Sequence, residues 1–338
     1  MKLYIYICEV EVKRTMEKEG IKIYKNRNYE GCTPYITVVT PVYNRKKTIK
    51  RTIDSVENQT YRNFEYIIVD DGSTDESDDI IFEYMNQTEC PVMYIKKPNG
   101  GVHTARNLGI RYARGMFEIN VDSDDELLPK ALQVFYDAWQ SIPDAEKSRY
   151  RVVVGQCMDE NGSRVGLPFP TNINQVTWPE AQKMCNAVHG EHIGFNVTKV
   201  LKDNPWPEPE GITFVTESIL WRKLDQEYKA WFINDMVRIY HTEGKDHLSG
   251  RHNKTLQSCR NVLWNTAYTL NHWPIYRTTF SKYIYSALRH CIMCHVLKWH
   301  KDNYNNKYKL QGVKNHLLKI VLWIPSAIGA IVYVKKRM

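Results

Sequence analysis

The chain has 338 residues, of which 43% are hydrophobic and 25% charged, a composition that supports one large or two modest domains and excludes a wholly disordered chain. From His272 onward there are twelve Lys or Arg residues against one acid, Asp302, so this tail carries +11, and the rest of the chain sums to −3 within a net charge of +8. The basic character therefore belongs to the C-terminal tail.

Residues 1–34 are predicted to be an N-terminal extension, because a clear alternation of apolar and polar residues begins only with "YITVVT" at 35–40. The apolar run in "MKLYIYICEVEVK" is too short for a signal peptide and is followed at once by charges. The eight cysteines show no disulfide-framework spacing. These features predict a reduced, cytoplasmic protein.

Strand and helix patterns then alternate along the chain. Ile49, Ile53 and Val56 share one helical face, and Ser73 or Thr74 is a candidate N-cap for the next helix. The predicted elements, in order, are a strand at 35–40, a helix at 48–56, a strand at 64–70, a helix from 73–74, a strand at 92–97, a helix at 105–113 and a strand at 116–121. This order predicts an α/β fold with a mostly parallel sheet, right-handed crossovers and flanking helices.

Polar segments follow three of these strands, namely "TPVYN" at 40–44, "DDGSTD" at 70–75 and "DSDD" at 122–125. They are expected to line one crevice, because ligands of such sheets bind beyond the carboxyl ends of the strands. Mg²⁺ or Mn²⁺ is usually held by one or two carboxylates plus substrate phosphates, and Asp122-Ser123-Asp124 supplies that set. The chain lacks both GxxxxGK[ST] and GxGxxG, so a metal is expected to hold the phosphates.

Asp71 lies at the tip of an earlier strand. Its carboxylate is an acceptor suited to the imide N–H of a uracil or to a ribose hydroxyl. The alternative is that Asp70, Asp71 and Asp75 only cap the following helix, and for Asp75 this alternative is favoured.

Two blocks, "TPVYNRKKTIKRTIDSVENQTYRNFEYIIVDDGSTDES" and "NGGVHTARNLGIRYARGMFEINVDSDDELLP", resemble the nucleotide-binding half of family 2 glycosyltransferases, which have the GT-A fold. A looser similarity to the acceptor half of bacterial members that build surface polysaccharides continues through "VVVGQCMDENGSRVG", "PWPEPEGITFVTESILWRKL" and "VRIYHTEGKDHLSG". The resemblance implies a GT-A domain over 35–250, divided into a nucleotide-sugar half (35–135) and an acceptor half (136–250). Beyond the part that the resemblance covers, a helical C-terminal region is expected over 251–316.

The resemblance also implies roles for single residues in donor binding. Pro41 and Tyr43 would line the nucleotide pocket, and Asp71 would read the base. Asp122 and Ser123 would bind the nucleotide-sugar, with Asp122 contacting the ribose or phosphates. Asp124 would be the metal ligand for Mn²⁺ or Mg²⁺, and Asp122 would help to hold the metal. Asp125 would assist or cap the helix near Pro129. Arg106 in "ARN" would lie near the nucleotide, or would instead belong to a solvated helix flank.

For the catalytic base, the family pattern places an acid shortly before a tryptophan-containing helix, and Glu217 in "FVTESILW" is the match. It would deprotonate the acceptor hydroxyl in an inverting transfer. Glu208 and Glu210 in "PWPEPEG" are competitors, although their proline neighbours indicate a lid or turn. His241 could reach the metal or diphosphate, or could be structural.

Processive synthases of this superfamily carry QxxRW, whereas here Gln257 and Arg260 are followed by Asn261, and Trp264 comes too late. The expected reaction is therefore transfer of one sugar from a nucleotide-sugar, a UDP-sugar, to a glycan or lipid-linked acceptor. Nucleic acid is not an expected partner. A sugar nucleotidyltransferase and a non-catalytic sugar-nucleotide binder remain as alternatives.

The last segment, 317–338, holds an apolar stretch interrupted by Pro325 and Gly329 and followed by "KKR". It is predicted to be an interfacial anchor at the inner face of the cytoplasmic membrane, with a buried core helix as the alternative. The Cys291 and Cys294 pair, flanked by His290 and His295, is predicted to pack in an apolar helix, with a zinc site as the less favoured alternative.

Overall fold

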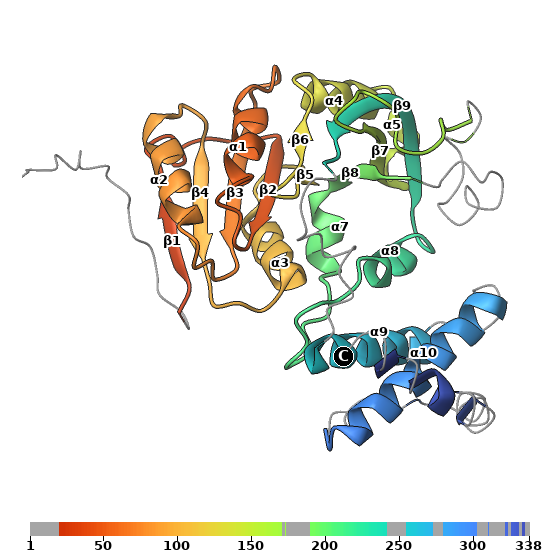
Figure 1. Ribbon diagram of the computed structural model, residues 1–338. Helices are drawn as coiled ribbons and strands as arrows, with labels where there is room; N and C mark the ends of the chain where they lie inside the picture. The colour runs from red at the N-terminus through yellow and green to blue at the C-terminus, as the bar shows by residue number, and fades with distance from the viewer. Residues whose placement is uncertain are drawn as a thin grey trace, which may run out of the picture. The chain divides into compact units, whose positions relative to one another are not determined.

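The structure is a computed structural model that describes residues 20–170, 173, 190–241, 255–272, 280–302, 310, 322–323, 326–330 and 333–334 (Figure 1). The chain divides into two compact units. The first comprises Met1–Trp206 and Leu220–Thr242, and the second comprises Pro207–Ile219 and Glu243–Met338. The donor-site candidates and the base candidates therefore belong to different units, and each unit is considered by itself.

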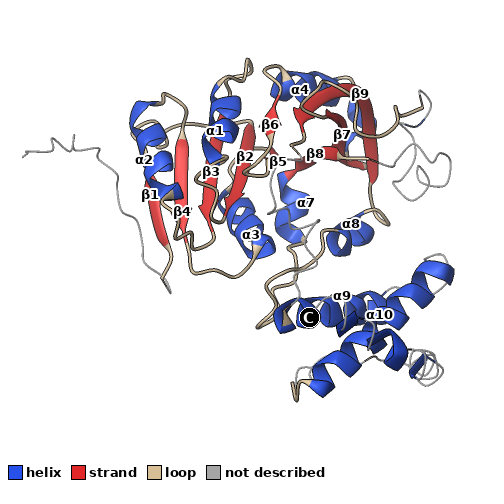
Figure 2. Cartoon of the chain, viewed as in Figure 1, coloured by secondary structure: helices blue, strands red, loops and turns tan. Residues whose placement is uncertain are grey.

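The described part of the first unit contains a nine-stranded sheet, whose strand order is β1-β4-β3-β2-β5-β8-β7-β9-β6 (Figure 2). Its strands are β1 Lys22–Lys25, β2 Ile36–Val42, β3 Phe64–Asp70, β4 Val92–Lys96, β5 Phe117–Asn120, β6 Glu126–Leu127, β7 Tyr150–Met158, β8 His192–Val197 and β9 Lys229–Ile239. Strands β4, β3, β2 and β5 are parallel neighbours. The predicted mostly parallel α/β sheet is confirmed.

Two strands, β1 and β8, form pairings that go beyond the predicted pattern. β1 lies within the segment expected to be an extension and pairs antiparallel with β4. β8 runs antiparallel to both β5 and β7, so the sheet continues into residues 136–250. In parallel sheets both faces are covered, and the central strands β2 and β3 are accordingly buried at every position.

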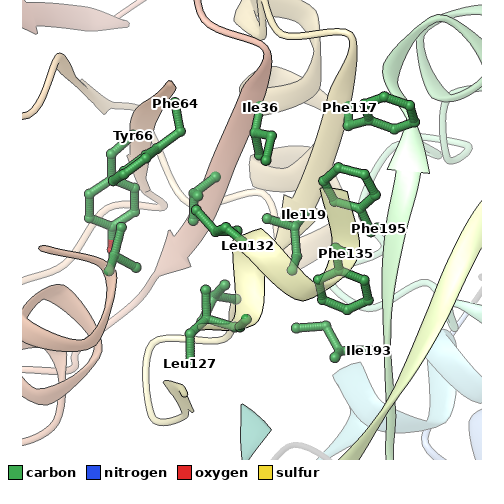
Figure 3. Packing of buried hydrophobic residues seen from close by; sticks show 14 of the residues in the cluster. Ile36, Phe64, Tyr66, Phe117, Ile119, Leu127, Leu132, Phe135, Ile193 and Phe195 are labelled. Carbon is green, nitrogen blue, oxygen red and sulfur yellow. The ribbon is translucent and has the colours of Figure 1, made fainter. Parts of the chain in front are cut away.

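Helices cover both faces of the parallel strands. α1 Ile49–Glu57, α2 Ser77–Gln87 and α4 Ala131–Gln140 pack on one face in a large apolar cluster, part of which is shown in Figure 3. α3 Val102–Tyr112 covers the opposite face. Its Gly109 allows a close approach, because a Cβ there would lie 2.5 Å from a methyl carbon of Val39.

α2 begins later than predicted. Its N-cap is Glu76 and not Ser73 or Thr74. The amide N–H of Ser73 donates to Oδ1 of Asp70 at 2.6 Å, and that of Thr74 donates to a side chain of the preceding loop. These bonds hold the residues in a turn, because short polar side chains compete with helix formation by bonding nearby backbone.

The described part of residues 136–250 adds three helices, α5 Asp144–Lys147, α7 Thr198–Asp203 and α8 Ser218–Leu224. The β7 register contains an extra residue, Arg151, between Tyr150 and Val152. Arg151 forms a buried ion pair with Asp225, and its guanidinium lies 5.1 Å from the ring centre of Trp221 in α8. A bulge can redirect a side chain in this way, and here it fastens the C-terminal part of α8 to the sheet.

In the second unit, α9 Leu256–His272 packs against α10 Phe280–Trp299. Cys291 and Cys294 are both buried in α10, and Cys294 belongs to an apolar cluster with Cys259. Most of the predicted anchor at 317–338 lies outside the described residues. Among the helices that the structure describes, none combines the length and apolar composition needed to cross a bilayer.

Candidate active site

The three polar segments after the strands are held together by hydrogen bonds. The backbone N–H of Asn44 donates to Ser73 Oγ at 3.0 Å, and the N–H of Thr74 donates to Asn44 Oδ1 at 2.8 Å. Thr48 Oγ1, just before α1, donates to the carbonyl of Ser123 at 2.9 Å. The structure thus brings together the loops at 40–48, 70–75 and 122–126, which we call the strand-end site.

Each acidic side chain of residues 122–126 lies beside an arginine. The pairs are Asp122 Oδ1 with Arg106 Nη2 at 2.8 Å, Asp124 Oδ2 with Arg45 Nε at 3.7 Å, Asp125 Oδ2 with Arg238 Nη1 at 3.1 Å, and Glu126 Oε1 with Arg51 Nε at 3.5 Å. Positive and negative charges are therefore matched one to one. An anionic diphosphate can approach such a site without facing uncompensated carboxylates.

Asp122 and Arg106 form an ion pair, and Arg106 is buried, so it does not lie on the solvated helix flank that was its alternative. Burial acts to raise the pKa of Asp122, but the guanidinium groups of Arg106 and Arg238 outweigh it, so the pKa lies below the ordinary aspartate value. The Asp122 side chain keeps 42% of its surface exposed, whereas that of Arg106 keeps 8%. Asp122 is therefore an accessible, ionised carboxylate supported from behind by a buried cation.

Asp124 also keeps exposed surface, with 22% of its side chain accessible. Two accessible carboxylates separated by one residue match the donor set by which Mg²⁺ or Mn²⁺ is held beside substrate phosphates. Within the described ranges no group of three or more His, Cys, Asp or Glu side chains is arranged around a common point for a metal ion. The residues that would hold a cation here are Asp122 and Asp124.

Asp125 has a different environment and does not cap α4, whose N-cap is Lys130. Burial raises the pKa of Asp125 to about 7, against the opposing effect of Arg238. Its Oδ1 accepts the backbone N–H of His241 at 3.2 Å. Asp125 therefore ties the strand-end site to the end of β9.

His241 lies at the strand-end site, but its ring faces other carboxylates. Nε2 lies 2.6 Å from Glu126 Oε1, and Nδ1 lies 3.6 Å from Glu160 Oε1. The residue is thus brought beside the acidic loop across 115 positions of sequence, although its two nitrogens point at Glu126 and Glu160 and not at the two metal candidates.

Asp71 is almost buried, with 4% of its side chain exposed. Its Oδ1 accepts a hydrogen bond from the N–H of Gly100 at 2.9 Å and forms an ion pair with Lys97. Its Oδ2 accepts a hydrogen bond from the N–H of Gly101 at 2.8 Å. Asp71 therefore fixes the glycine turn that leads into α3. Asp75 accepts the N–H of Ser77 at 3.2 Å, which confirms its predicted role at the start of α2.

Of the two residues expected to line a nucleotide pocket, Tyr43 is 48% exposed directly after β2. Pro41 is buried within β2, opposite Val69 of β3. Ser123 is 6% exposed, and its backbone carbonyl is used by Thr48. The side chain of Tyr43 is thus accessible to a ligand, whereas Pro41 is a buried part of the strand.

Glu217 directly precedes α8, which contains Trp221, and its side chain is exposed. The predicted tryptophan-containing helix after Glu217 is confirmed. Glu208 and Glu210 are also exposed, and the chain turns at Glu210 and Gly211, as the prolines indicated. These three acids belong to the second unit.

Side-chain amides of α9 hold the segment that leads to Glu217. Gln257 Nε2 donates to the carbonyl of Gly211 at 2.8 Å. The N–H of Thr213 donates to Asn261 Oδ1 at 3.1 Å, and the N–H of Thr216 donates to Asn265 Oδ1 at 2.9 Å. The amide row of Gln257, Asn261 and Asn265 therefore fixes the backbone of residues 211–216.

Sequence reasoning named Arg106 but missed the other cations of the strand-end site. Arg45 comes three residues after β2 and Lys97 directly follows β4, so their proximity to strand ends was a usable signal, whereas Arg51 lies within α1. Arg238 carried no such signal, because its partner Asp125 is more than a hundred residues earlier in the chain.

Comparison with known proteins assigns the chain to a protein family. The model of glycosyl transferase family 2 matches residues 37–199. Glycosyltransferase GlyG of Streptococcus pneumoniae is 37% identical over 217 residues, which are 61% of this chain and 70% of GlyG. The chain belongs to glycosyltransferase family 2, and the resemblance stated from the sequence is confirmed.

Other relatives are much longer than the matched region. Glycosyltransferase GlyA of the same organism is 38% identical over 101 residues, which are 30% of this chain and 14% of GlyA. Chondroitin synthase of Escherichia coli is 37% identical over 136 residues, which are 39% of this chain and 20% of the synthase. The chain thus spans only a small part of these two relatives.

Solved structures show the same fold. TarS of S. aureus in complex with UDP-GlcNAc has a TM-score of 0.55 at 19% identity, covering 88% of this chain and 81% of that chain. Mannosyltransferase PcManGT of Pyrobaculum calidifontis, in complex with GDP-Man and Mn²⁺, has a TM-score of 0.50 at 14% identity, covering 90% and 86%. The predicted GT-A fold is confirmed.

Proposed function

We propose that the chain is a metal-dependent, inverting glycosyltransferase that moves one sugar from a UDP-sugar to a hydroxyl of a glycan or lipid-linked oligosaccharide during surface polysaccharide synthesis. The observation that carries this proposal is the strand-end site itself. Two accessible carboxylates, Asp122 and Asp124, stand among matched arginines within the region that the family model covers. The UDP-GlcNAc bound to TarS supports the choice of nucleotide, and the Mn²⁺ bound to PcManGT supports the choice of metal.

In this mechanism the strand-end residues bind and orient the donor. Asp122, held by Arg106, would contact the ribose or phosphates, and Tyr43 would border the nucleotide. A divalent cation held by Asp122 and Asp124 supplies stabilisation of the negative charge that develops on the departing diphosphate. Glu217 would accept the proton of the acceptor hydroxyl, so that the hydroxyl attacks the anomeric carbon from the face opposite the leaving group.

A screen of sugar nucleotides tests the proposal. The purified chain is incubated with a panel of UDP-sugars and GDP-mannose, with MnCl₂ or MgCl₂, and release of nucleoside diphosphate is measured. We expect hydrolysis of a UDP-sugar that requires the divalent cation and is stopped by EDTA. Binding without any turnover favours a non-catalytic sugar-nucleotide binder, and synthesis of a nucleotide-sugar from a sugar phosphate favours a nucleotidyltransferase.

We also propose a peripheral location at the cytoplasmic face of the membrane. The excess of Lys and Arg after His272 favours binding to anionic lipid, and Ile328 within the proposed anchor is 63% exposed. Ser326 and Ala330 of the same segment are buried, and Ala330 packs in the apolar cluster of α9 and α10, as the alternative of a buried core helix requires. Deleting residues 317–338 is expected to remove binding to vesicles of anionic phospholipid in a flotation assay while donor hydrolysis continues. If the truncated chain binds the vesicles as well as the full chain, the anchor assignment is wrong.

A further inference from the structure

An asparagine of α3 holds a distant part of the chain. Asn107 is only 5% exposed. Its Nδ2 donates to the carbonyl of Trp206 at 2.8 Å, and its Oδ1 accepts the N–H of Trp206 at 3.0 Å. One amide side chain therefore satisfies both main-chain groups of a residue that lies 99 positions later in the sequence. Because buried main-chain groups need such partners, these two bonds fix the place of Trp206.

The ring of Trp206 contacts the tryptophan of α8. Trp206 is 2% exposed, and its ring forms a T-shaped pair with Trp221, with 5.3 Å between the ring centroids and 78° between the ring planes. Such pairs add to the stabilisation that burial of the two rings supplies. Trp206 Nε1 has no hydrogen-bond partner among the residues that the structure describes. The contact with α8 is therefore one of ring packing.

Trp221 is also held to the sheet. The guanidinium of Arg151 in β7 lies 5.1 Å from the centre of the Trp221 ring, and Arg151 forms a buried ion pair with Asp225, the residue after α8. Asn107, Trp206, Arg151 and residues 220–225 all belong to the first unit. The position of α8 in this unit is thus set by α3, through Trp206, and by β7.

The position of α8 matters for the acid that precedes it. Glu217 comes directly before α8, and Trp221 lies four residues later, about one helical turn. A shift of the helix is therefore passed to Glu217 through the main chain. Catalytic groups are sensitive to such shifts, because a general base has to lie within hydrogen-bond reach of the proton that it accepts.

We propose that Asn107 is a positioning residue for the general base: by holding Trp206 against Trp221 it fixes α8 and, with the helix, the place of Glu217. This inference rests on the proposed function, in which Glu217 accepts the proton of the attacking hydroxyl. In donor hydrolysis water takes the place of the acceptor. Its oxygen bonds to the anomeric carbon, the bond from that carbon to the diphosphate breaks, and Glu217 takes the proton.

Two substitutions weaken the contact between α3 and α8 in different ways. Asn107→Leu removes both bonds to Trp206 but keeps a side chain of similar size. Trp206→Phe makes the ring that meets Trp221 smaller, removes no hydrogen bond of the indole within the described part of the chain, and leaves the main-chain bonds to Asn107 in place.

Asn26→Leu is the matched control, because Asn26 holds main chain in the same manner elsewhere. Asn26 is 3% exposed, its Nδ2 donates to the carbonyl of Cys90 at 2.8 Å, and its Oδ1 accepts the N–H of Val92 at 3.0 Å. Val92 is the first residue of β4, so this asparagine lies at the amino end of a parallel strand. The strand-end site lies beyond the carboxyl ends.

Hydrolysis of the UDP-sugar identified by the screen is followed with MnCl₂, UDP affinity is measured by calorimetry, and thermal unfolding is recorded for each variant. We expect Asn107→Leu to lower kcat by about 10- to 100-fold with UDP affinity unchanged, since a misplacement of about 1 Å can lower a rate by about 10². Trp206→Phe should lower kcat in the same way. Asn26→Leu should lower the melting temperature as Asn107→Leu does, because both leave buried main-chain groups without their partner, but its kcat should stay at the wild-type value.

A double variant separates positioning of the base from a general loss of structure. If Asn107 acts through Glu217, Asn107→Leu should have little further effect in a Glu217→Gln background, because residues that act as one unit give non-additive losses. Losses that multiply in the double variant contradict the inference. If Asn107→Leu fails to fold, Trp206→Phe alone and combined with Glu217→Gln provides the same test.

Wild-type kcat in folded Asn107→Leu and Trp206→Phe variants overturns the inference and leaves the proposed function standing. A loss of kcat in Asn26→Leu equal to that in Asn107→Leu, or a loss of UDP affinity that accounts for the fall in turnover, also rules it out. Normal hydrolysis by Glu217→Gln alone removes both the base assignment and the inference. If the wild-type chain hydrolyses no sugar nucleotide with Mn²⁺ or Mg²⁺, the proposed function itself is wrong.

Discussion

Replacing Glu217 with glutamine is expected to lower sugar transfer by about 10²- to 10⁴-fold, which is the usual contribution of a general base. Glutamine keeps the shape and the hydrogen-bonding capacity of glutamate but cannot accept the proton of the acceptor hydroxyl. Donor affinity should stay near the wild-type value, because a base for the acceptor contributes little to holding the nucleotide. Transfer is measured with the UDP-sugar identified by the hydrolysis screen, and UDP affinity is measured by calorimetry.

Glu208→Gln and Glu210→Gln are matched controls, since both acids are exposed in the same segment. Normal transfer by the Glu217 variant together with loss of transfer in either control would place the base in the "PEPEG" turn. The anomeric configuration of the product is a second check on the mechanism. An α-linked donor should give a β-linked product, and retention of configuration would remove the direct displacement from which the base was argued.

Asp124→Asn is expected to reduce donor turnover by more than about 100-fold, above the usual effect of losing a group behind a metal ligand. The fold should remain intact, because Asp124 is partly exposed in the turn between β5 and β6. Mn²⁺ affinity in the presence of UDP should fall in parallel, and the far-UV circular dichroism spectrum should be unchanged. Removal of metal from the wild-type chain with EDTA should reproduce the loss, and added MnCl₂ should reverse it.

Asp54→Asn is the control for this substitution. Asp54 is an exposed acid of α1 whose partner is Lys50, one turn earlier in the same helix, and its loss should leave both turnover and Mn²⁺ affinity unchanged. Full activity of the Asp124 variant in a metal-dependent reaction would show that other residues hold the metal.

The sequence was sufficient for the parallel core and for the loops that form the strand-end site. Those features follow from local periodicity and from the rule that strand ends share an edge, and the bonds among Asn44, Ser73 and Thr74 bear this out. β1 was missed, because a four-residue strand with only one fully buried position has little periodic signal. The start of α2 was misplaced, because Ser73 resembles an N-cap in sequence while its N–H is bonded to Asp70.

The pairing of distant charges could not be predicted from spacing. Asp125 and Arg238 are joined only because β9 ends beside the acidic loop, and the β6 and β9 pairing that places them is antiparallel and two residues long. The full burial of the charged residue Glu118 in β5 was equally hidden, since "MFEINV" gives a strand but does not reveal which face lies under α3. Polar residues inside a sheet are identified only when both neighbouring strands are known.

The amide row on α9 fixes the length of the chain segment that leads to Glu217. Successive members of the row are four residues apart, about 6 Å along a helix, and they engage the backbone at Gly211, Thr213 and Thr216. These three bonds use main-chain atoms of the segment, and Asn261 also donates to the hydroxyl of Thr213, so the row constrains the length of the segment more than most of its side chains. One inserted or deleted residue would displace the acid by a whole step of an extended chain, about 3.3 Å, farther than a proton can be passed.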